Sequence, residues 1–336
     1  MQWEITYACP LRCSHCYSES GVRPARHLRG DELMRLADAL AALKPRVVHV
    51  SGGEPLVIKE LPQVAERLAR AGVSVVLTTS GMGLHEEQAR AIAAAFHSIH
   101  VSVDGADAQT HDRIRGRAGS FDAALAALAT FDRISRERRA AGGAPLRFGL
   151  DAVILRSNFD QLARLVTDVA SRFDELEWVI GSAVVPVGLA SRESYDVELL
   201  TDEQLAKIRD PEFVESLRAL AKPHVYVELR DNQDLQIHPD LVEEGAAWTL
   251  DRLVVEPDGQ VRALGAYEGL VGSLLDEPIE ILWQRANERR RDPFVTATLA
   301  KVRTPAEWAA AARTIDLKFA SPADRERIAR RKTYVP

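Results

Sequence analysis

All three cysteines of the chain lie in one eight-residue stretch, at Cys9, Cys13 and Cys16. Their C-x3-C-x2-C spacing differs from the paired C-x2-4-C units that are usual in structural zinc sites. Closely spaced thiolates are typical iron–sulfur ligands, and three of them can hold three irons of a cubane cluster while the fourth iron stays open. Because an open iron allows chemistry, we interpret this stretch as catalytic. A zinc site formed by the three thiolates with His15 or His27 is the structural alternative.

Glycines and polar residues also follow three later runs of β-type residues. They are Gly52-Gly53-Glu54 after residues 47–50, Thr79 after residues 73–77, and Ser102 to Asp104 at the end of residues 98–103. In parallel α/β folds, sites form where the carboxyl ends of the strands meet. We therefore expect these residues to surround one mouth together with the cysteines. Taken singly, the glycines would indicate a tight turn and the hydroxyls would indicate helix caps.

The elements that would position these residues alternate regularly over the first half of the chain. About six strand-then-helix units are visible, with strands at 2–7, 47–50, 73–77, 98–103, 146–155 and 176–185, and with helices at 29–43, 61–71, 85–95, 120–138 and 160–172. Ser120 is the expected cap of the fourth helix. Such alternation predicts an α/β fold with a parallel sheet covered by helices.

After about residue 187 the regular alternation of strands and helices ends. Residues 201–220 indicate two helical pieces interrupted at Asp210-Pro211, and residues 225–229 indicate a short strand. Residues 251–264 predict a hairpin that turns at Pro257-Asp258-Gly259, and a helix is expected at 278–291.

Composition narrows the class of protein. The formal net charge is −6, and acidic residues lie among the arginine clusters, so the charge pattern does not indicate a nucleic-acid-binding surface. No run reaches the about 18 apolar residues of a membrane span. We expect no signal peptide, because the opening Met-Gln-Trp-Glu-Ile lacks a basic-then-apolar leader. An odd, tight group of cysteines favours a metal site in a reducing compartment. We expect a cytoplasmic enzyme that binds neither nucleic acid nor membranes.

The ordered set of motifs resembles the radical S-adenosylmethionine (SAM) superfamily. The resemblance rests on the cysteine stretch, on residues 52–55 (GGEP), on residues 102–105 (SVDG), and on residues 111–116 (HDRIRG) and 119–122 (GSFD). It implies a partial (β/α)6 TIM-like barrel over residues 1–190. It also implies one [4Fe-4S] cluster on Cys9, Cys13 and Cys16, with SAM on the open iron.

The resemblance further implies the SAM contacts. Gly52, Gly53 and Glu54 match the motif that meets the SAM amine; glycine permits close backbone approach, and a carboxylate can accept from an ammonium group. Thr79 is a further expected contact, although Ser80 follows it where the family uses Asn. Ser102 is expected at the SAM ribose or carboxylate, and Arg115 at the carboxylate, with Arg113 as the competing choice. The backbone of His15 is expected near the adenine. No catalytic side chain is assigned.

Residues 253–262 and 271–274 resemble the SPASM/Twitch extension, in which cysteines around such a hairpin hold auxiliary clusters. No cysteine follows Cys16. We therefore expect residues 191–336 to form a degenerate, cysteine-free SPASM/Twitch-like α+β extension with helices; an ordinary Pro-Asp-Gly turn is the alternative for the hairpin.

The resemblance implies reductive cleavage of SAM to a 5′-deoxyadenosyl radical, which takes hydrogen from a substrate, with a reductant such as flavodoxin or ferredoxin. Because a second cluster and a spare thiol are missing, we favour redox-neutral decarboxylation, elimination or rearrangement of a small sugar- or nucleoside-like substrate in specialised metabolism. Maturation of a ribosomally made precursor peptide is the main alternative, and a non-catalytic zinc or cluster-binding module is another. Candidate substrate contacts are Glu228, Arg230, Asp231 and Tyr195.

Overall fold

The computed structural model describes residues 1–235, 253–265 and 267–336. Within these residues, ten strands form a single sheet in the order β10-β9-β8-β1-β2-β3-β4-β5-β6-β7. Strands β1 to β7 are parallel to their neighbours. Their bounds are Gln2–Thr6 (β1), Val47–Gly52 (β2), Ser74–Thr79 (β3), Ser98–Ser102 (β4), Phe148–Ile154 (β5), Trp178–Ala183 (β6) and Tyr226–Arg230 (β7).

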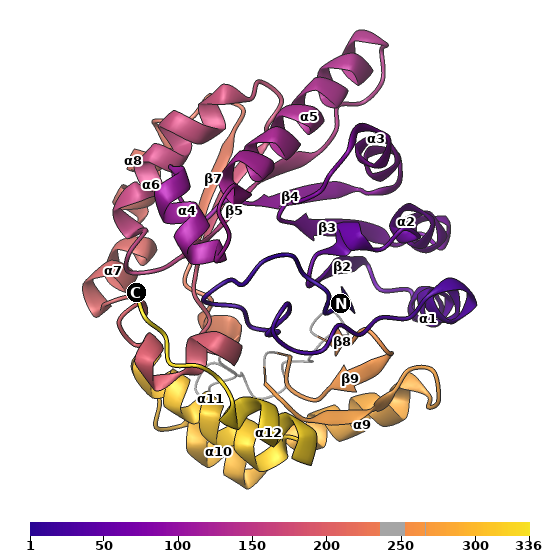
Figure 1. Cartoon of the computed structure of the whole chain (residues 1–336), viewed down its shortest axis with the longest axis vertical. Coiled ribbons are helices and arrows are strands. Elements are labelled where there is room, and N and C mark those ends of the chain that lie inside the picture. Colours follow the sequence, from indigo (N-terminus) through magenta and orange to yellow (C-terminus); the bar gives the residue numbers. More distant parts are fainter. Residues whose placement is uncertain (236–252, 266) are drawn as a thin grey trace.

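Helices join the parallel strands and cover the outer face of the curved sheet (Figure 1). They are α1 (Gly30–Ala42), α2 (Leu61–Arg70), α3 (Glu86–Ala95), α4 (Ala108–Arg115), α5 (Ser120–Ala140), α6 (Leu162–Arg164), α7 (Asp202–Arg209) and α8 (Pro211–Arg218). The long loop after β1, which carries the cysteines, crosses the inner side of the curved sheet in Figure 1. The predicted parallel sheet with covering helices is confirmed.

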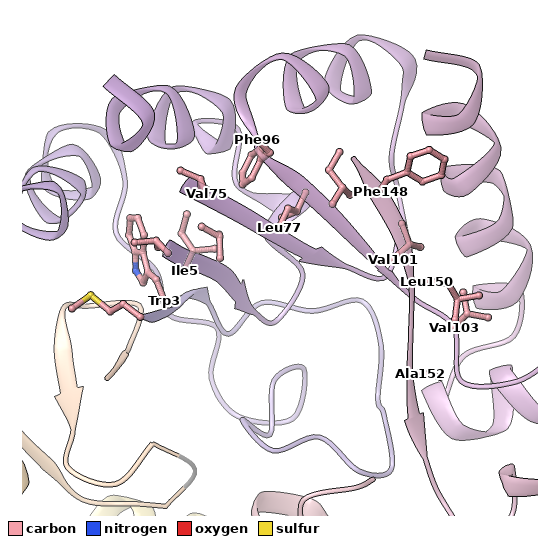
Figure 2. Close-up of a cluster of buried hydrophobic side chains, with 14 of the residues drawn as sticks. Trp3, Ile5, Val75, Leu77, Phe96, Val101, Val103, Phe148, Leu150 and Ala152 are labelled. Carbon is pink, nitrogen blue, oxygen red and sulfur yellow. The ribbon is translucent and has the colours of Figure 1, made fainter. Parts of the chain in front are cut away.

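The two faces of the strands have different side chains because alternate residues of a strand point to opposite faces. Trp3 and Ile5 of β1 are fully buried in the core between the sheet and the outer helices, as are Leu77 and Val101 of β3 and β4. Figure 2 shows these side chains on the same side of their strands. The alternate residues, such as Gln2, face the inner side. The inner face is therefore polar, whereas the outer face is apolar and covered by helices.

The C-terminal part extends the sheet beyond β1. Strand β8 (Val254–Val255) is parallel to β1, while β9 (Gln260–Arg262) and β10 (Leu270–Ser273) are antiparallel to their neighbours. The predicted hairpin is confirmed for its described residues; positions 251 and 252 lie outside them. Gly259 has φ +86 in the turn, a conformation that glycine adopts without strain.

Four helices end the chain: α9 (Ile279–Arg290), α10 (Pro293–Leu299), α11 (Pro305–Phe319) and α12 (Pro322–Ala329). The segment after α12 returns across the molecule toward the cysteine loop (Figure 1). The C-terminal residues thus form a wall beside that loop. In the part of the chain that the structure describes, no helix has the length and apolar character needed to cross a membrane.

Several local predictions need correction. Ser120 does not cap α5: the N-cap is Gly119, and the Ser120 hydroxyl instead donates to Asp112 at 2.8 Å. The helix expected at 160–172 is irregular, because α6 continues as a π-helical turn (Leu165–Val169) and a 3-10 turn. Helix α4 was missing from the sequence prediction. Strands β7 and β8, which lie beyond residue 190, belong to the same sheet as β1 to β6.

Candidate active site

The backbone of the cysteine loop is held by two separate elements. The Arg12 and Ser14 amides donate to the carbonyls of Arg115 and Ile114 in α4, at 3.1 and 2.9 Å. The Leu189 amide, after β6, donates to the Cys16 carbonyl at 3.0 Å. The loop is therefore fixed by the fold on both sides of Cys13, although it has no regular secondary structure of its own.

Two glycines allow this loop to approach its neighbours closely. A Cβ atom at Gly53 would lie 2.1 Å from the Ala8 carbonyl oxygen. At Gly188, which has φ +56, a Cβ atom would lie 2.2 Å from the Tyr17 carbonyl oxygen. Neither distance is possible for a real side chain, so both contacts depend on glycine. Gly53, predicted from sequence, is thus a packing requirement of the cysteine loop.

The three thiols are free and half-buried. Burial raises the pKa of Cys9 to about 11 and that of Cys13 to about 12, and it also raises the pKa of Cys16. Thiolates are the form that binds metal, so a bound metal would have to supply positive charge to deprotonate them. The Arg115 guanidinium already favours the Cys13 thiolate, because its Nη1 donates to the Cys13 Sγ at 3.9 Å.

The donor set fits a cluster with three protein ligands. Within the described ranges, no three His, Cys, Asp or Glu side chains come together closely enough to hold a single metal ion. A cubane cluster does not need such convergence, because each of its irons takes one thiolate. Cys9, Cys13 and Cys16 come from one loop, and each presents a free thiol.

A buried ion pair stands behind Cys13. The Arg115 Nε lies 2.6 Å from Asp104 Oδ2, and both side chains are buried. Burial alone would raise the pKa of Asp104, but Arg115, with His15 and His111, lowers it overall. Asp104 Oδ1 also accepts from the Val153 amide at 2.8 Å. The pair fixes the guanidinium against the cysteine loop.

His15 lies on the same network. Its Nε2 is 3.7 Å from Asp104 Oδ2, and its buried Nδ1 has no hydrogen-bond partner among the described residues. Burial lowers the pKa of His15 to about 4, so the ring is neutral. An unsatisfied buried nitrogen beside the cysteines is consistent with a ligand that completes its hydrogen bonding.

Arg115 and Arg113 have different surroundings, although sequence left the choice between them open. Arg115 is buried beside Cys13, whereas Arg113 forms an ion pair with Glu198 at 3.1 Å and donates to the Ser157 hydroxyl at 2.7 Å. Residues two apart on a helix point in nearly opposite directions. Only Arg115 of the two faces the cysteine loop.

Glu54 joins the ends of two neighbouring strands. Its buried carboxylate accepts from the Thr79 hydroxyl at 2.6 Å, from the Ser80 amide at 2.8 Å, from the Ser80 hydroxyl, and from the Leu56 amide at 3.2 Å. Burial raises the pKa of Glu54, and the Ser80 and Thr79 bonds partly oppose this rise. Four donors occupy the usual acceptor positions of a carboxylate. Glu54 and Thr79, both predicted SAM contacts, therefore contact each other in this structure.

Ser102 is buried at the end of β4, on the same rim as Gly52, Gly53 and Thr79. The strand-end residues thus meet at one edge of the sheet, as expected. Their individual contacts with SAM remain predictions.

A cavity of about 1080 Å³ lies on the polar inner side of the sheet. Its lining side chains come mainly from β7, α8, α7 and β2. They include Gln2, Tyr17, His49, Ser51, Thr78, Glu228, Arg230 and Asp231. The hydroxyl of Tyr17, the residue after Cys16, accepts a hydrogen bond from Gln2 Nε2 at 2.6 Å. We call this space the inner cavity. It reaches the loop after β1 only at Tyr17, and Cys9, Cys13 and Cys16 are not among the described residues that line it.

Three of the four candidate substrate residues line this inner cavity, and Tyr195 does not. The Tyr195 side chain is buried, and its hydroxyl lies 3.0 Å from the Ser14 Oγ, so it supports the cysteine loop instead. Sequence reasoning also missed Tyr17 and the role of Asp104. The position of Tyr17 beside Cys16 was the available signal for the first, and the Ser102-Val103-Asp104-Gly105 motif was the signal for the second.

Comparison with known proteins agrees with this geometry. Residues 3–138 match the model of the Radical SAM superfamily. The chain contains a radical SAM domain. Enzymes of this superfamily use a [4Fe-4S] cluster and SAM, which are therefore the cofactors of this chain.

Relatives of the radical SAM domain differ in how much of the chain they share. The AdoMet-dependent heme synthase of Methanosarcina barkeri is 27% identical, over 87% of this chain and 84% of the relative. The mycofactocin maturase MftC of Mycolicibacterium smegmatis is 34% identical, over 48% of this chain and 39% of the relative. The crystal structure of Streptococcus suis SuiB bound to S-adenosylmethionine covers 90% of this chain and 68% of its own, with a TM-score of 0.63 and 13% identity. The fold is the radical SAM barrel.

Proposed function

We propose that this radical SAM enzyme acts on a small, polar, sugar- or nucleoside-like substrate in the inner cavity, by redox-neutral decarboxylation, elimination or rearrangement. With the cluster and SAM bound, reductive cleavage of SAM supplies the radical that removes a hydrogen atom from the substrate. The observation that carries the proposal is the inner cavity itself, which joins the polar face of the strands to the cysteine loop at Tyr17.

The lining of the inner cavity suits a hydroxyl-rich ligand. It offers amide, hydroxyl, imidazole, carboxylate and guanidinium groups, and its volume of about 1080 Å³ is sufficient for a small molecule. The Glu228 and Arg230 side chains form an ion pair with 2.6 Å between Oε2 and Nη2, at the edge of that space. Such a mixture of donors and acceptors can orient sugar hydroxyls and one charged group.

The cysteine count supports redox-neutral chemistry. The whole sequence contains three cysteines, and all three are assigned to the SAM cluster. No thiolate is left for a second cluster that could accept an electron from a substrate radical, or for a thiol hydrogen donor. A reaction that needs neither is the simplest one for this chain.

In this proposal Cys9, Cys13 and Cys16 would hold the cluster, and Arg115 would favour the Cys13 thiolate. Gly52, Gly53, Ser102 and the His15 segment would contact SAM from the rim of the sheet. Glu54 and Thr79 would act mainly by tying the ends of β2 and β3 together, since their polar atoms are already paired.

Two further features complete the proposal. A low-potential protein such as flavodoxin or ferredoxin would deliver the electron, and the three free thiols suit the reducing cytoplasm. We also propose residues 1–190 as the barrel domain and residues 191–336 as a SPASM/Twitch-like extension without an auxiliary cluster, whose first strand, β7, completes the wall of the inner cavity.

The decisive experiment is isotope transfer. The enzyme, reconstituted without oxygen, is incubated with SAM, reductant and a panel of deuterated sugar nucleotides and nucleosides. Deuterium in 5′-deoxyadenosine, with loss of carbon dioxide or water or an isomeric product, would identify the attacked carbon. Deuterium transfer from peptides alone would show that the substrate class is wrong.

Peptide maturation is the second candidate, and the match to MftC favours it. That match covers 48% of this chain, whereas the heme synthase match covers 87%. The C-terminal half supplies much of the inner cavity, so a relative that shares both halves is the better guide to substrate size. The peptide arm of the isotope experiment separates the two candidates.

A further inference from the structure

A second cavity, of about 1060 Å³, opens on the other side of the cysteine loop. Arg12, Cys13 and Ser14 form one wall, and residues 323–335 at the C-terminal end form the opposite wall. None of the residues that the structure describes lines both this space and the inner cavity. We call it the outer cavity. The cysteine loop therefore separates two spaces, and Cys13 belongs to the outer one.

The outer cavity is strongly basic in a chain whose formal net charge is −6. Three of its lining residues are acidic, at Glu19, Asp324 and Glu326, and eight are basic, at Arg12, Arg23, Arg26, Arg192, Arg327, Arg330, Arg331 and Lys332. Such a local excess of one sign creates a field that attracts an oppositely charged partner.

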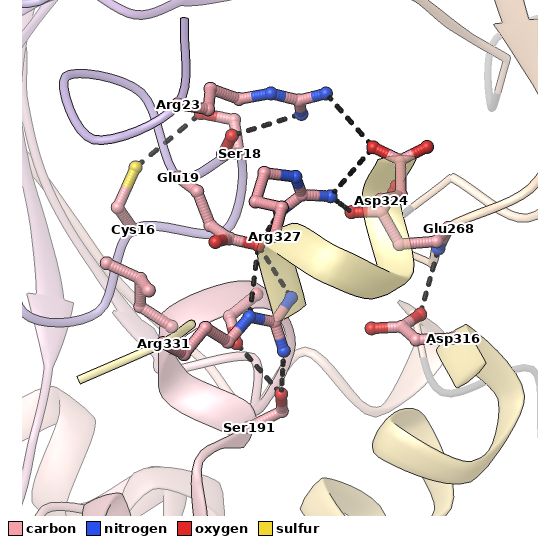
Figure 3. A network of polar contacts seen from close by, with 12 residues as sticks. Cys16, Ser18, Glu19, Arg23, Ser191, Glu268, Asp316, Asp324, Arg327 and Arg331 are labelled. Atoms are coloured by element: carbon pink, nitrogen blue, oxygen red, sulfur yellow. Dashed lines mark hydrogen bonds and ion pairs between the residues drawn. The ribbon is translucent and has the colours of Figure 1, made fainter. Parts of the chain in front are cut away.

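The acidic residues of the outer cavity already form ion pairs with arginines. Glu19 forms ion pairs with Arg327 and with Arg331, the latter at 2.6 Å, and Asp324 pairs with Arg327 and Arg23 at 3.2 and 3.8 Å (Figure 3). These pairs fix the wall of the cavity without neutralising the remaining cations.

Three cations remain without a carboxylate partner among the described residues. Arg12 donates to the Cys9 and Leu11 carbonyls, and Arg192 donates to the Ser14 carbonyl at 2.8 Å. Lys332 is exposed at the mouth. The free positive charge thus lies directly around the exposed edge of the cysteine loop.

We infer that the outer cavity is the docking site for an acidic electron-donor protein. The inference rests on the proposed function, which requires one electron per SAM cleaved. A donor bound here would place its redox group against Arg12, Cys13 and Ser14, the part of the cluster-binding loop nearest to it. One electron leaves the donor, which is oxidised, and the cluster is reduced; no atom is transferred. The substrate side remains free, because the inner cavity is separate.

The test reverses two charges at the mouth of the outer cavity, away from the cluster ligands. Lys332 is exposed, and Arg330 has an 80% exposed side chain paired with Glu326 four residues earlier. The matched control is K59E/R70E, because Lys59 is exposed and Arg70 has an 81% exposed side chain paired with Glu66 four residues earlier. Both double variants change the net charge equally and spare the cysteine loop.

Binding of a flavodoxin, used as the acidic probe, is measured by calorimetry with the reconstituted holoenzyme. At low salt the K332E/R330E variant should bind about tenfold more weakly than wild type, while K59E/R70E should bind like wild type. The difference should vanish at about 0.5 M salt, where charges are screened. Carbodiimide should cross-link flavodoxin carboxylates to Lys332.

Equal affinities of wild type and K332E/R330E at low salt would overturn the inference. Binding of an acidic 20-residue peptide, in preference to flavodoxin, would also overturn it and would identify a peptide site. Dithionite bypasses docking, so both double variants should cleave SAM with dithionite at the wild-type rate. Loss of dithionite-driven cleavage in wild type itself would instead contradict the proposed function, and the binding measurements would still decide the docking site.

Discussion

The inner and outer cavities have nearly equal volumes but different charge. In the inner cavity, three arginines face three carboxylates, and pairs such as Arg209–Asp231 at 2.8 Å connect them. In the outer cavity, basic residues outnumber acidic ones by eight to three. Balanced charges favour specific hydrogen bonding to one ligand, whereas an excess of one sign favours fast, long-range attraction. The difference indicates that the inner cavity binds one ligand specifically, whereas the outer cavity attracts an oppositely charged partner from a distance.

The largest effect should come from removing a thiol of the cysteine loop, which lies between the two cavities. Cys13→Ala should abolish 5′-deoxyadenosine formation and lower the iron content well below the about four irons per chain of a single cubane. Ser14→Ala, next to it in the same loop, should keep the iron. Iron analysis and chromatography of 5′-deoxyadenosine check both. Retained SAM cleavage in Cys13→Ala would contradict the cluster assignment, and about eight irons in wild type would contradict a single cluster.

The buried Asp104–Arg115 ion pair should contribute mainly to the free energy of unfolding and less to binding in either cavity. Asp104→Asn leaves the Arg115 guanidinium buried without its partner, so the free energy of unfolding should fall by about 3–5 kcal/mol. Asp38→Asn, which breaks an exposed pair with Arg67, should change it by less than about 1 kcal/mol. Urea unfolding of the metal-free chains without oxygen provides the comparison. Similar losses in both variants would show that the buried pair has no special role.

Asp316, a buried carboxyl in α11, should make the stability of the fold depend on pH. Burial, with the nearby Glu268 carboxylate, raises the pKa of Asp316 to about 7, while the unfolded chain has about 3.9. The folded state therefore keeps a proton that the unfolded chain loses, so this stabilisation is complete below about pH 4 and lost as the pH rises through 7.

Asp316→Asn removes that titration but keeps an oxygen for the Glu268 amide, which lies 2.9 Å from Asp316 Oδ1. The free energy of unfolding of wild type minus that of the variant should decrease by about 4 kcal/mol between pH 4 and pH 8. Urea titrations at several pH values measure it. A difference that stays constant with pH would be inconsistent with the burial of an acidic proton.

The smallest expected effect tests whether the two cavities act independently. Arg230→Gln, in the inner cavity, should raise KM for the substrate by about tenfold, the size of one lost charge-assisted hydrogen bond. It should leave flavodoxin affinity unchanged, whereas K332E/R330E should show the reverse pattern. Steady-state kinetics with the substrate identified by isotope transfer provides the first measurement. A variant that changes both quantities would show that the two cavities are not independent.

The rim of the site could be predicted because runs of β-type residues are followed first by glycines or polar residues and then by helices. That order indicates a parallel sheet, so the strand ends, and with them Gly53 and Ser102, could be placed on one edge. Helix α4 was missed because it has eight mostly polar residues, although Asp107 as N-cap and Gly116 after its end marked its bounds.

Contacts between strand ends were not predictable in the same way. Glu54 was expected to face SAM, but its partners Thr79 and Ser80 lie on the next strand, and nothing local signals the pairing. The outer cavity depends on contacts between Glu19 and Arg327 or Arg331, which are about three hundred positions apart in the chain. Pairings at such separation follow from the fold and leave no local pattern.

The ion pairs of Glu19 with α12 have a consequence for how the enzyme matures. A ribosome synthesises residue 19 long before residue 327, so the loop that takes up iron emerges well before the arginines that pair with Glu19. Until α12 has emerged and docked, the Glu19 carboxylate lacks both of its arginines and the loop lacks one wall. Stable iron loading should therefore follow the synthesis and docking of α12.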